Sequence, residues 1–109
     1  MAEVIHLDSL EWKLVRPDIA HGVHGKTLLD GSVKVVQTRV EPGGTFSPHR
    51  DSYGHLLYLL SGTGIVGIGR KTFDVRAGHV VQISPGDEHF YRNSGSDDLI
   101  LISLNISGM

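Results

Sequence analysis

Four side chains that could bind one metal ion occur in this chain: His49, Asp51, His55 and, further along, His89. Imidazole nitrogen suits first-row transition metals, and a carboxylate oxygen can join such a ligand set. Residues two apart in a strand point to the same face, so we expect His49 and Asp51 to share one face. His55 keeps the same parity unless a bulge at Gly54 re-aims it. The pattern therefore predicts a mononuclear site for a divalent transition metal.

Brief apolar and β-branched segments alternate with turn residues along the chain, which predicts that short strands position these side chains. The first long segment, residues 32–41, ends at Pro42-Gly43-Gly44, a strong turn signal. Short strands at near-regular spacing predict an all-β sandwich or barrel, and His89 would reach the site from a neighbouring strand of a closed sheet. The further strands are expected over residues 55–60, 65–68, 72–75, 79–83, from 90 onward, and 98–106.

The first 30 residues are expected to form an irregular arm with strand pieces, within the same domain as a barrel over residues 31–109. Residues 8–15 are the only helical candidate, and Arg16-Pro17 would end that helix quickly. The arm carries more apolar surface than a loose tail needs, and an open sheet edge would need covering, so we expect a homodimer. The apolar side chains concerned are Ile5, Leu7, Trp12, Leu14 and Val15.

Length, charge and composition exclude several classes of protein. A chain of 109 residues is the size of one domain. The net charge of −2 and the lack of a basic block argue against nucleic-acid binding. The longest apolar runs are too short to cross a bilayer. The chain has no cysteine and no segment that reads as a signal peptide, so we expect a cytoplasmic protein.

Two spaced motifs in the middle of the chain carry the four candidate ligands. They read Gly43-x5-His49-x-Asp51-x3-His55-x6-Gly62 and Gly78-x5-Ser84-x-Gly86-x2-His89-x3-Asn93. These motifs resemble the two motifs of the cupin family, G-x5-H-x-H-x3-E-x6-G and G-x5-P-x-G-x2-H-x3-N, with every spacing matched. The resemblance implies a small cupin fold, a double-stranded β-helix or jelly-roll barrel.

The resemblance also implies which residues bind the metal. His49 and His89 stand at ligand positions of the family, and His55 replaces its Glu. Asp51 replaces the second His, which leaves open whether it binds the metal or orients a ligand histidine from outside the ligand set. The first motif is similar in particular to small single-domain cupins that bind manganese or iron through several histidines. Manganese or iron is therefore the expected ion, with nickel, cobalt and zinc as alternatives.

A metal centre of this kind would favour a small anionic or enol-like substrate, because a metal stabilises charge that develops on oxygen. His49, Asp51 and His89 also match the two-His-one-carboxylate set of non-haem Fe(II) oxygenases. We therefore expect a manganese- or iron-dependent dioxygenase, while catalysis itself stays open. The alternatives are a non-catalytic sugar or metabolite sensor and a metal-assisted isomerase or lyase of a sugar acid. Tyr91, two residues after His89, should face the interior and could position a substrate or donate a proton.

Overall fold

The structure is a computed structural model that describes residues 2–108, and its regular structure is almost entirely β-strand. The strands are β1 (Lys13–Leu14), β2 (Ala20–Asp30), β3 (Val33–His49), β4 (Gly54–Ser61), β5 (Thr63–Ile68), β6 (Lys71–Arg76), β7 (Val80–Ile83), β8 (His89–Asn93) and β9 (Leu99–Ile106). A 3-10 helix, η1 (Leu7–Ser9), precedes them. The predicted all-β class is confirmed. Within the described residues, no helix has the length and hydropathy that crossing a membrane requires.

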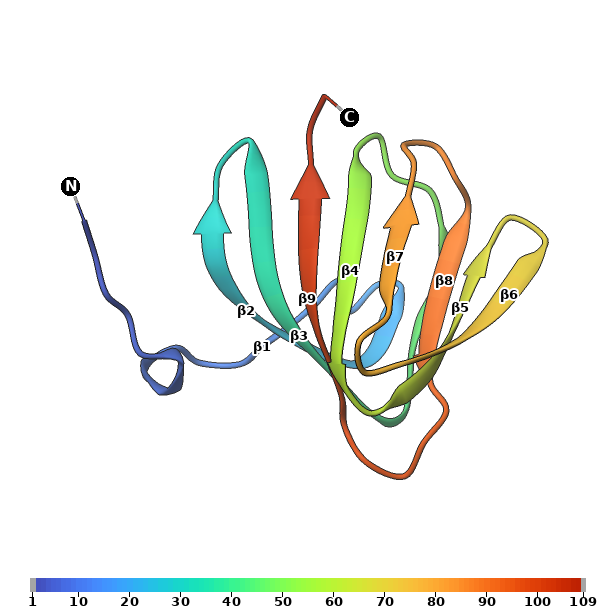
Figure 1. Ribbon diagram of the computed structural model, residues 1–109, viewed down its shortest axis with the longest axis horizontal. Helices are drawn as coiled ribbons and strands as arrows, with labels where there is room; N and C mark the ends of the chain where they lie inside the picture. The colour runs from blue at the N-terminus through green and yellow to red at the C-terminus, as the bar shows by residue number, and fades with distance from the viewer. Residues whose placement is uncertain (1, 109) are drawn as a thin grey trace.

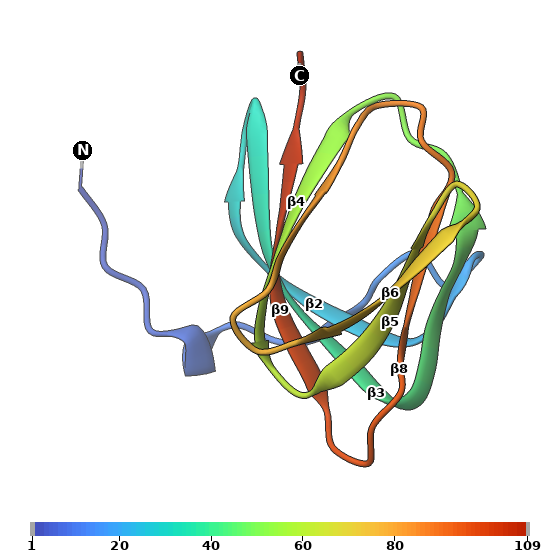
Figure 2. The ribbon, with the colours of Figure 1, turned by 45° about the vertical axis from the view of Figure 1, so that its right-hand side comes forward.

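The strands form one antiparallel sheet that curls back on itself (Figures 1 and 2). Its order is β6-β5-β8-β3-β9-β4-β7, with β2 on the other edge of β3 and β1 paired to β2. The long strand β3 pairs with β9 over Val33–Val40 and then with β8 from Thr45 to His49. Between these stretches Gly43 has a φ of 80°, which favours glycine and lets the strand bend. This change of partner joins two halves of the sheet, which lie across from one another in Figure 2.

The hydrophobic core fills the space between the two halves. Alternate residues of the strands point inward, as the pleat of a sheet requires. In neighbouring strands the inward residues meet in register, for example Leu59 with Leu101 and Val66 with Tyr91. The buried apolar side chains are Val23, Val40, Phe46, Leu57, Leu59, Val66, Val75, Ile83, Tyr91, Leu99 and Leu101.

The first 30 residues differ from the sequence-based expectation. The predicted helix over residues 8–15 is wrong, because only Leu7–Ser9 is helical and Lys13–Leu14 forms a strand. Pairing with β2 gives hydrogen bonds to backbone N–H and C=O groups that would have no partner at the two ends of so short a helix. The strand piece in this region is also longer than expected, since β2 runs for 11 residues.

The first residues of the described chain extend away from the sheet, as Figure 1 shows. Val4 is fully exposed and half of Ile5 is exposed. Trp12 lies closer to the sheet, where the Lys26 ammonium and the Arg39 guanidinium approach its ring at 4.7 and 4.5 Å. The homodimer and the division into arm and barrel stay predictions.

Close packing between β5 and β8 yields a test of the strand arrangement. A Cβ atom at Gly67 would collide with the Phe90 ring. We therefore expect Gly67→Ala to lower the free energy of unfolding by about 1–3 kcal/mol, measured by urea denaturation. Adding Phe90→Leu should recover part of that loss, because the two residues share the same space. Gly31→Ala is the control, since its nearest atom lies 4.0 Å from the new Cβ, and an equal loss there would contradict the packing.

Candidate metal centre

The four predicted ligands come together at one end of the sheet. His49 is the last residue of β3, His55 lies on β4, and His89 is the first residue of β8, in register with His49. The expectation from strand parity that Asp51 shares a strand face with His49 is wrong, because β3 ends at His49 and Asp51 lies in the following loop. The loop nevertheless turns the Asp51 side chain toward the histidines.

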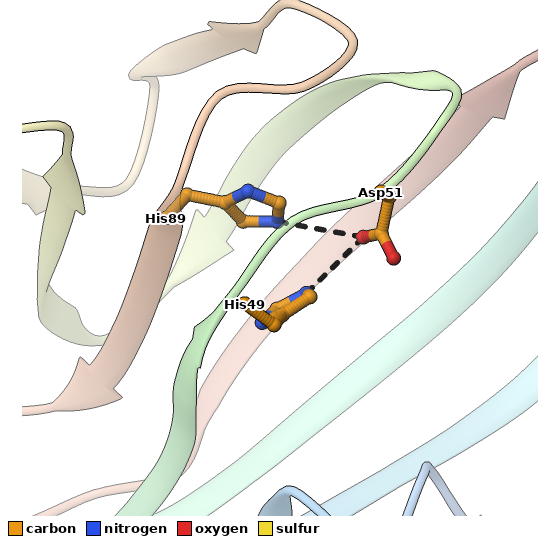
Figure 3. A group of neighbouring side chains, drawn as sticks. All are labelled: His49, Asp51 and His89. Carbon is orange, nitrogen blue, oxygen red and sulfur yellow. Dashed lines mark ion pairs between the residues drawn. The ribbon is translucent and has the colours of Figure 1, made fainter.

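The imidazole Nε2 atoms of all three histidines lie close to one carboxylate oxygen. Asp51 Oδ2 lies 3.1 Å from His49 Nε2, 2.9 Å from His55 Nε2 and 3.7 Å from His89 Nε2. The group whose ligand atoms all lie within 4.8 Å of one another is His49, Asp51 and His89, shown in Figure 3. His55 lies outside that group, yet it makes the shortest contact with Asp51. The His49, Asp51 and His89 cluster is compatible with a metal site.

The opposite side of each imidazole ring is held by an oxygen atom. In each histidine Nδ1 contacts an acceptor that has no proton to give, so Nδ1 carries the ring proton and donates it. The three contacts are His49 Nδ1 to Ser47 O at 2.7 Å, His55 Nδ1 to Asn105 Oδ1 at 3.0 Å, and His89 Nδ1 to Asp87 O at 2.9 Å. A neutral imidazole with its proton on Nδ1 keeps a lone pair on Nε2. Such outer hydrogen bonds are the usual way to fix the tautomer of a metal-binding histidine.

Three nitrogen lone pairs and a carboxylate oxygen facing one another require a cation between them. Protons on the Nε2 atoms or a metal ion would both satisfy that requirement. Ligand atoms that each lie about 2.0–2.2 Å from one ion are about 3.0–3.5 Å apart when they are neighbours around it. The contacts of 2.9, 3.1 and 3.7 Å from Asp51 Oδ2 are close to that spacing. The donor set and its spacing therefore fit a transition metal.

The position of Asp51 is fixed from outside the histidine cluster. Arg16 Nη1 donates to Asp51 Oδ1 at 3.1 Å, which leaves Oδ2 for the histidines. The Asp51 carbonyl accepts a hydrogen bond from the Gly86 amide at 2.8 Å. Arg16 has a φ of 39° and is the only non-glycine residue with positive φ in the described chain. Such a backbone conformation costs of order 1–3 kcal/mol, and strain of this kind often marks functional sites.

Burial and neighbouring charges shift the pKa values of two of these groups. Burial alone would raise the pKa of Asp51, but in the metal-free protein the contact with His55, the His49 and His55 rings when these are protonated, and the Arg16 guanidinium outweigh burial, so the pKa is lowered. Burial lowers the pKa of His89, and its hydrogen bond to the Asp87 carbonyl opposes that shift only in part. Asp51 is therefore ionised and His89 neutral at neutral pH, which is the state that metal binding needs.

A cavity of about 570 Å³ opens beside the four residues. Tyr91 lines it, and its ring packs 5.1 Å from the Phe46 ring, measured between centroids. Burial raises the pKa of Tyr91, so its hydroxyl stays protonated at neutral pH. The expected inward direction of Tyr91 is confirmed, while its catalytic role stays a prediction.

Sequence reasoning missed two residues of this site. Arg16 was interpreted only as the end of a short helix, and nothing in its spacing connects it to Asp51. Asn105 lies opposite His55 in the register of β4 and β9. Polar residues at inward positions of the mostly apolar last strand, Ser103 and Asn105, were the signal that could have found it.

The lowered pKa of His89 predicts how the metal-free protein responds to acid. In the unfolded chain this histidine has its ordinary pKa of about 6.5, so the unfolded chain binds a proton more readily than the folded chain. The free energy of unfolding should therefore fall as the pH drops below about 6.5. Asp51, with its lowered pKa, adds a further loss only below its unfolded value of about 3.8.

Urea denaturation of metal-free protein between about pH 7.5 and about pH 5 measures this effect. The variant His89→Gln should show a weaker pH dependence than the parent chain. His21→Gln is the control, because His21 is exposed and lies outside the site. The same pH dependence in His89→Gln as in the parent would contradict the assignment.

Several solved structures are similar to this chain. The polyketide cyclase RemF from Streptomyces resistomycificus has a TM-score of 0.87 at 20% identity, over 96% of this chain and 79% of that one. A predicted oxalate decarboxylase from Thermotoga maritima has a TM-score of 0.87 at 20% identity, over 95% of this chain and 98% of that one. KdgF from Halomonas sp. has a TM-score of 0.82 at 15% identity, over 96% and 94%. At these identities the similarity shows the fold alone.

No curated protein matches the sequence significantly. The family model described as "Cupin domain" matches residues 36–105, well over half of the chain, and this match includes all four candidate ligands. The strand order, the curled antiparallel sheet and the similar structures agree with that match. The expected small cupin fold is confirmed, and this chain belongs to the cupin family.

Proposed function

We propose that this protein is a metal-dependent enzyme that acts on a small substrate through oxygen atoms bound at one divalent transition metal. The observation that carries this proposal is the pairing of three fixed Nδ1 hydrogen bonds with three Nε2 atoms that lie within 3.7 Å of one carboxylate oxygen. A hydrogen-bonding network that serves folding alone has no need to fix one tautomer in three neighbouring histidines. A cavity beside the cluster leaves space for a substrate.

The proposed ligands are His49, His55, His89 and Asp51. His55 is included because its Nε2 atom makes the shortest contact with Asp51 Oδ2, and because Asn105 holds its other nitrogen. Imidazole and carboxylate ligands together suit manganese and iron as well as cobalt, nickel and zinc. We retain manganese or iron as the proposed ion.

The charges around the site decide what kind of substrate group it favours. Arg16 balances the carboxylate charge of Asp51, so the centre keeps the charge of a divalent ion. When bound, that ion would supply Lewis acidity toward a substrate oxygen. Apolar side chains such as Phe46, Leu57 and Ile83 line the cavity beside it and exclude water. An anionic or enol-like oxygen group is therefore the group that this site would bind.

A dioxygenase is the first candidate reaction class. His49, Asp51 and His89 form the group of mutually close ligand atoms, which is the two-His-one-carboxylate set that non-haem iron oxygenases use. In that case His55 would either complete the ligand set or hold Asp51 in place. The proposed role of Tyr91 is to position the substrate with its neutral hydroxyl.

A non-oxidative reaction is the second candidate, because of the similar structures. The polyketide cyclase and the predicted oxalate decarboxylase are named for substrates that present several oxygen atoms. A Lewis acid that binds such oxygens can promote an isomerase, lyase or cyclase reaction without dioxygen. A binding protein without turnover would use the same ligand set, and the two experiments below distinguish these cases.

The first experiment measures metal content. We expect one manganese or iron ion per chain after reconstitution of metal-free protein, detected by elemental analysis. Alanine at His49, His55 or His89 should abolish or strongly weaken binding, because each change removes one imidazole ligand. The loss of metal affinity in Asp51→Asn should be strong if the carboxylate binds the ion, and about 10- to 100-fold if the carboxylate only orients a histidine.

His21→Ala serves as the matched control, since it removes an exposed histidine outside the site. Circular dichroism shows whether each variant still folds. A folded His89→Ala protein that binds metal as tightly as the parent would exclude the proposed site.

The second experiment separates the two reaction classes. Protein reconstituted with Fe(II) or Mn(II) should consume dioxygen when small enol-like or 2-hydroxy acid substrates are added, measured with an oxygen electrode. Zinc-loaded protein is the control, because zinc has no redox chemistry. Substrate conversion without oxygen uptake, equal in the zinc protein, would favour the isomerase or lyase class. Binding without conversion for any metal would contradict an enzymatic function.

A further inference from the structure

The cavity beside the metal centre extends along the inner face of the sheet, away from the histidines. Strand register places its wall residues in rows across β4, β9 and β3. His55 on β4 is opposite Asn105 on β9, which is opposite Lys34 on β3. All three residues line the cavity. One row therefore begins at the proposed metal centre and ends at a lysine.

Lys34 faces the cavity because of its place in β3. It shares strand parity with Thr38 and Val40, which are 2% and 0% exposed and point into the molecule. Its backbone position is fixed on both sides, by β9 through Asn105 and by β2 through Asp30. Lys34 is half-buried there, and a lysine at an inward position is uncommon because lysine side chains mostly lie on the surface.

Among residues 2–108, the Lys34 ammonium has no protein partner, which leaves it available to a ligand. It forms no hydrogen bond and no ion pair within 4.0 Å, not even with Asp30, the acid opposite it in register. Arg16 and Asp51 neutralise each other, so the other charged wall residues are Lys13, Lys34 and Glu11. The part of the cavity beyond the metal centre is therefore cationic on balance.

Polar groups also line the wall in and beside this row. Thr38 Oγ1 and Ser103 Oγ lie 3.1 Å apart on neighbouring strands, and both residues line the cavity. The Asn105 side chain holds His55 and lies between it and Lys34 in the row. Hydroxyl and amide groups at inward positions weaken an apolar core, but they provide hydrogen bonds for a polar ligand.

We propose that the ligand of this cavity carries two anionic oxygen groups, one bound at the metal centre and the other bound by Lys34. The inference rests on the proposed function and names its substrate class as a small, linear dianion. Adjacent strands lie about 4.8 Å apart, so two strand spacings place the Lys34 and His55 Cα atoms about 10 Å from each other. Both side chains line the same cavity, so a ligand with a short carbon chain could contact both residues.

The experiment uses zinc-loaded protein, because zinc binds the oxygen groups without redox chemistry. The probes are 2-oxo acids, which can bind a metal through the carboxylate and the adjacent oxo group. Oxaloacetate, 2-oxoglutarate and 2-oxoadipate carry a distal carboxylate, while 2-oxobutanoate, 2-oxopentanoate and 2-oxohexanoate match them in chain length without it. Isothermal titration gives the affinity of each pair.

We expect at least one diacid to bind about fivefold or more tightly than its matched monoacid, which corresponds to one partly screened ion pair. Lys34→Gln should remove that preference while leaving metal content and monoacid affinity unchanged. Lys34→Arg should retain it, because the charge remains. Lys71→Gln is the control, since Lys71 lies on β6 and does not line the cavity.

Three results would overturn the inference. Equal affinity for diacids and monoacids at every chain length would do so, as would a preference that persists in Lys34→Gln. Either result leaves the metal centre in place, because the zinc content is measured before each titration. Parent protein that holds no zinc and gains none on reconstitution would contradict the proposed function and this inference together.

Discussion

Three hydrogen bonds on the outer side of the histidine rings determine the rest of this site. Each Nδ1 proton is held by an oxygen atom from a different part of the chain: a β3 carbonyl, a β9 amide and a carbonyl in the loop before β8. As a consequence, three Nε2 atoms are left free of that proton, and all three lie within 3.7 Å of Asp51 Oδ2. The bend of β3 and its change of partner from β9 to β8 matter because they bring these three segments to the same end of the sheet.

The site is maintained at the expense of stability elsewhere. Arg16 adopts a backbone conformation that only glycine adopts readily, and its guanidinium holds the second oxygen of Asp51. The inner face of the sheet carries Asn105, Ser103 and Lys34 where aliphatic residues would pack better. Local rules are most often broken at functional sites, so their clustering around one cavity supports a binding or catalytic role for it.

The turn residues predicted the fold class, and the match to both cupin motifs predicted the convergence of His49, Asp51 and His89, whereas strand parity gave the wrong reason for the position of Asp51. The local sequence alone could not rule out a helix over residues 8–15, since the pairing of Lys13–Leu14 with β2 is a tertiary effect. Asp51 reaches the histidines through a loop rather than a strand face. Arg16 lies 35 residues from Asp51 in sequence, and no local rule connects them. Backbone carbonyls that fix a tautomer carry no sequence signal at all.

The central claim is that His49, His55 and His89 bind one metal ion through Nε2 while Nδ1 keeps the proton. Long-range correlation of ring ¹H and ¹⁵N nuclei in ¹⁵N-labelled protein, before and after addition of zinc, measures it most directly. We predict that all three rings show a protonated Nδ1, and that zinc shifts the Nε2 resonance of these three histidines and of none of the other four. Protonated Nε2 atoms in the zinc-treated protein, or resonances that zinc leaves unchanged, would contradict the claim.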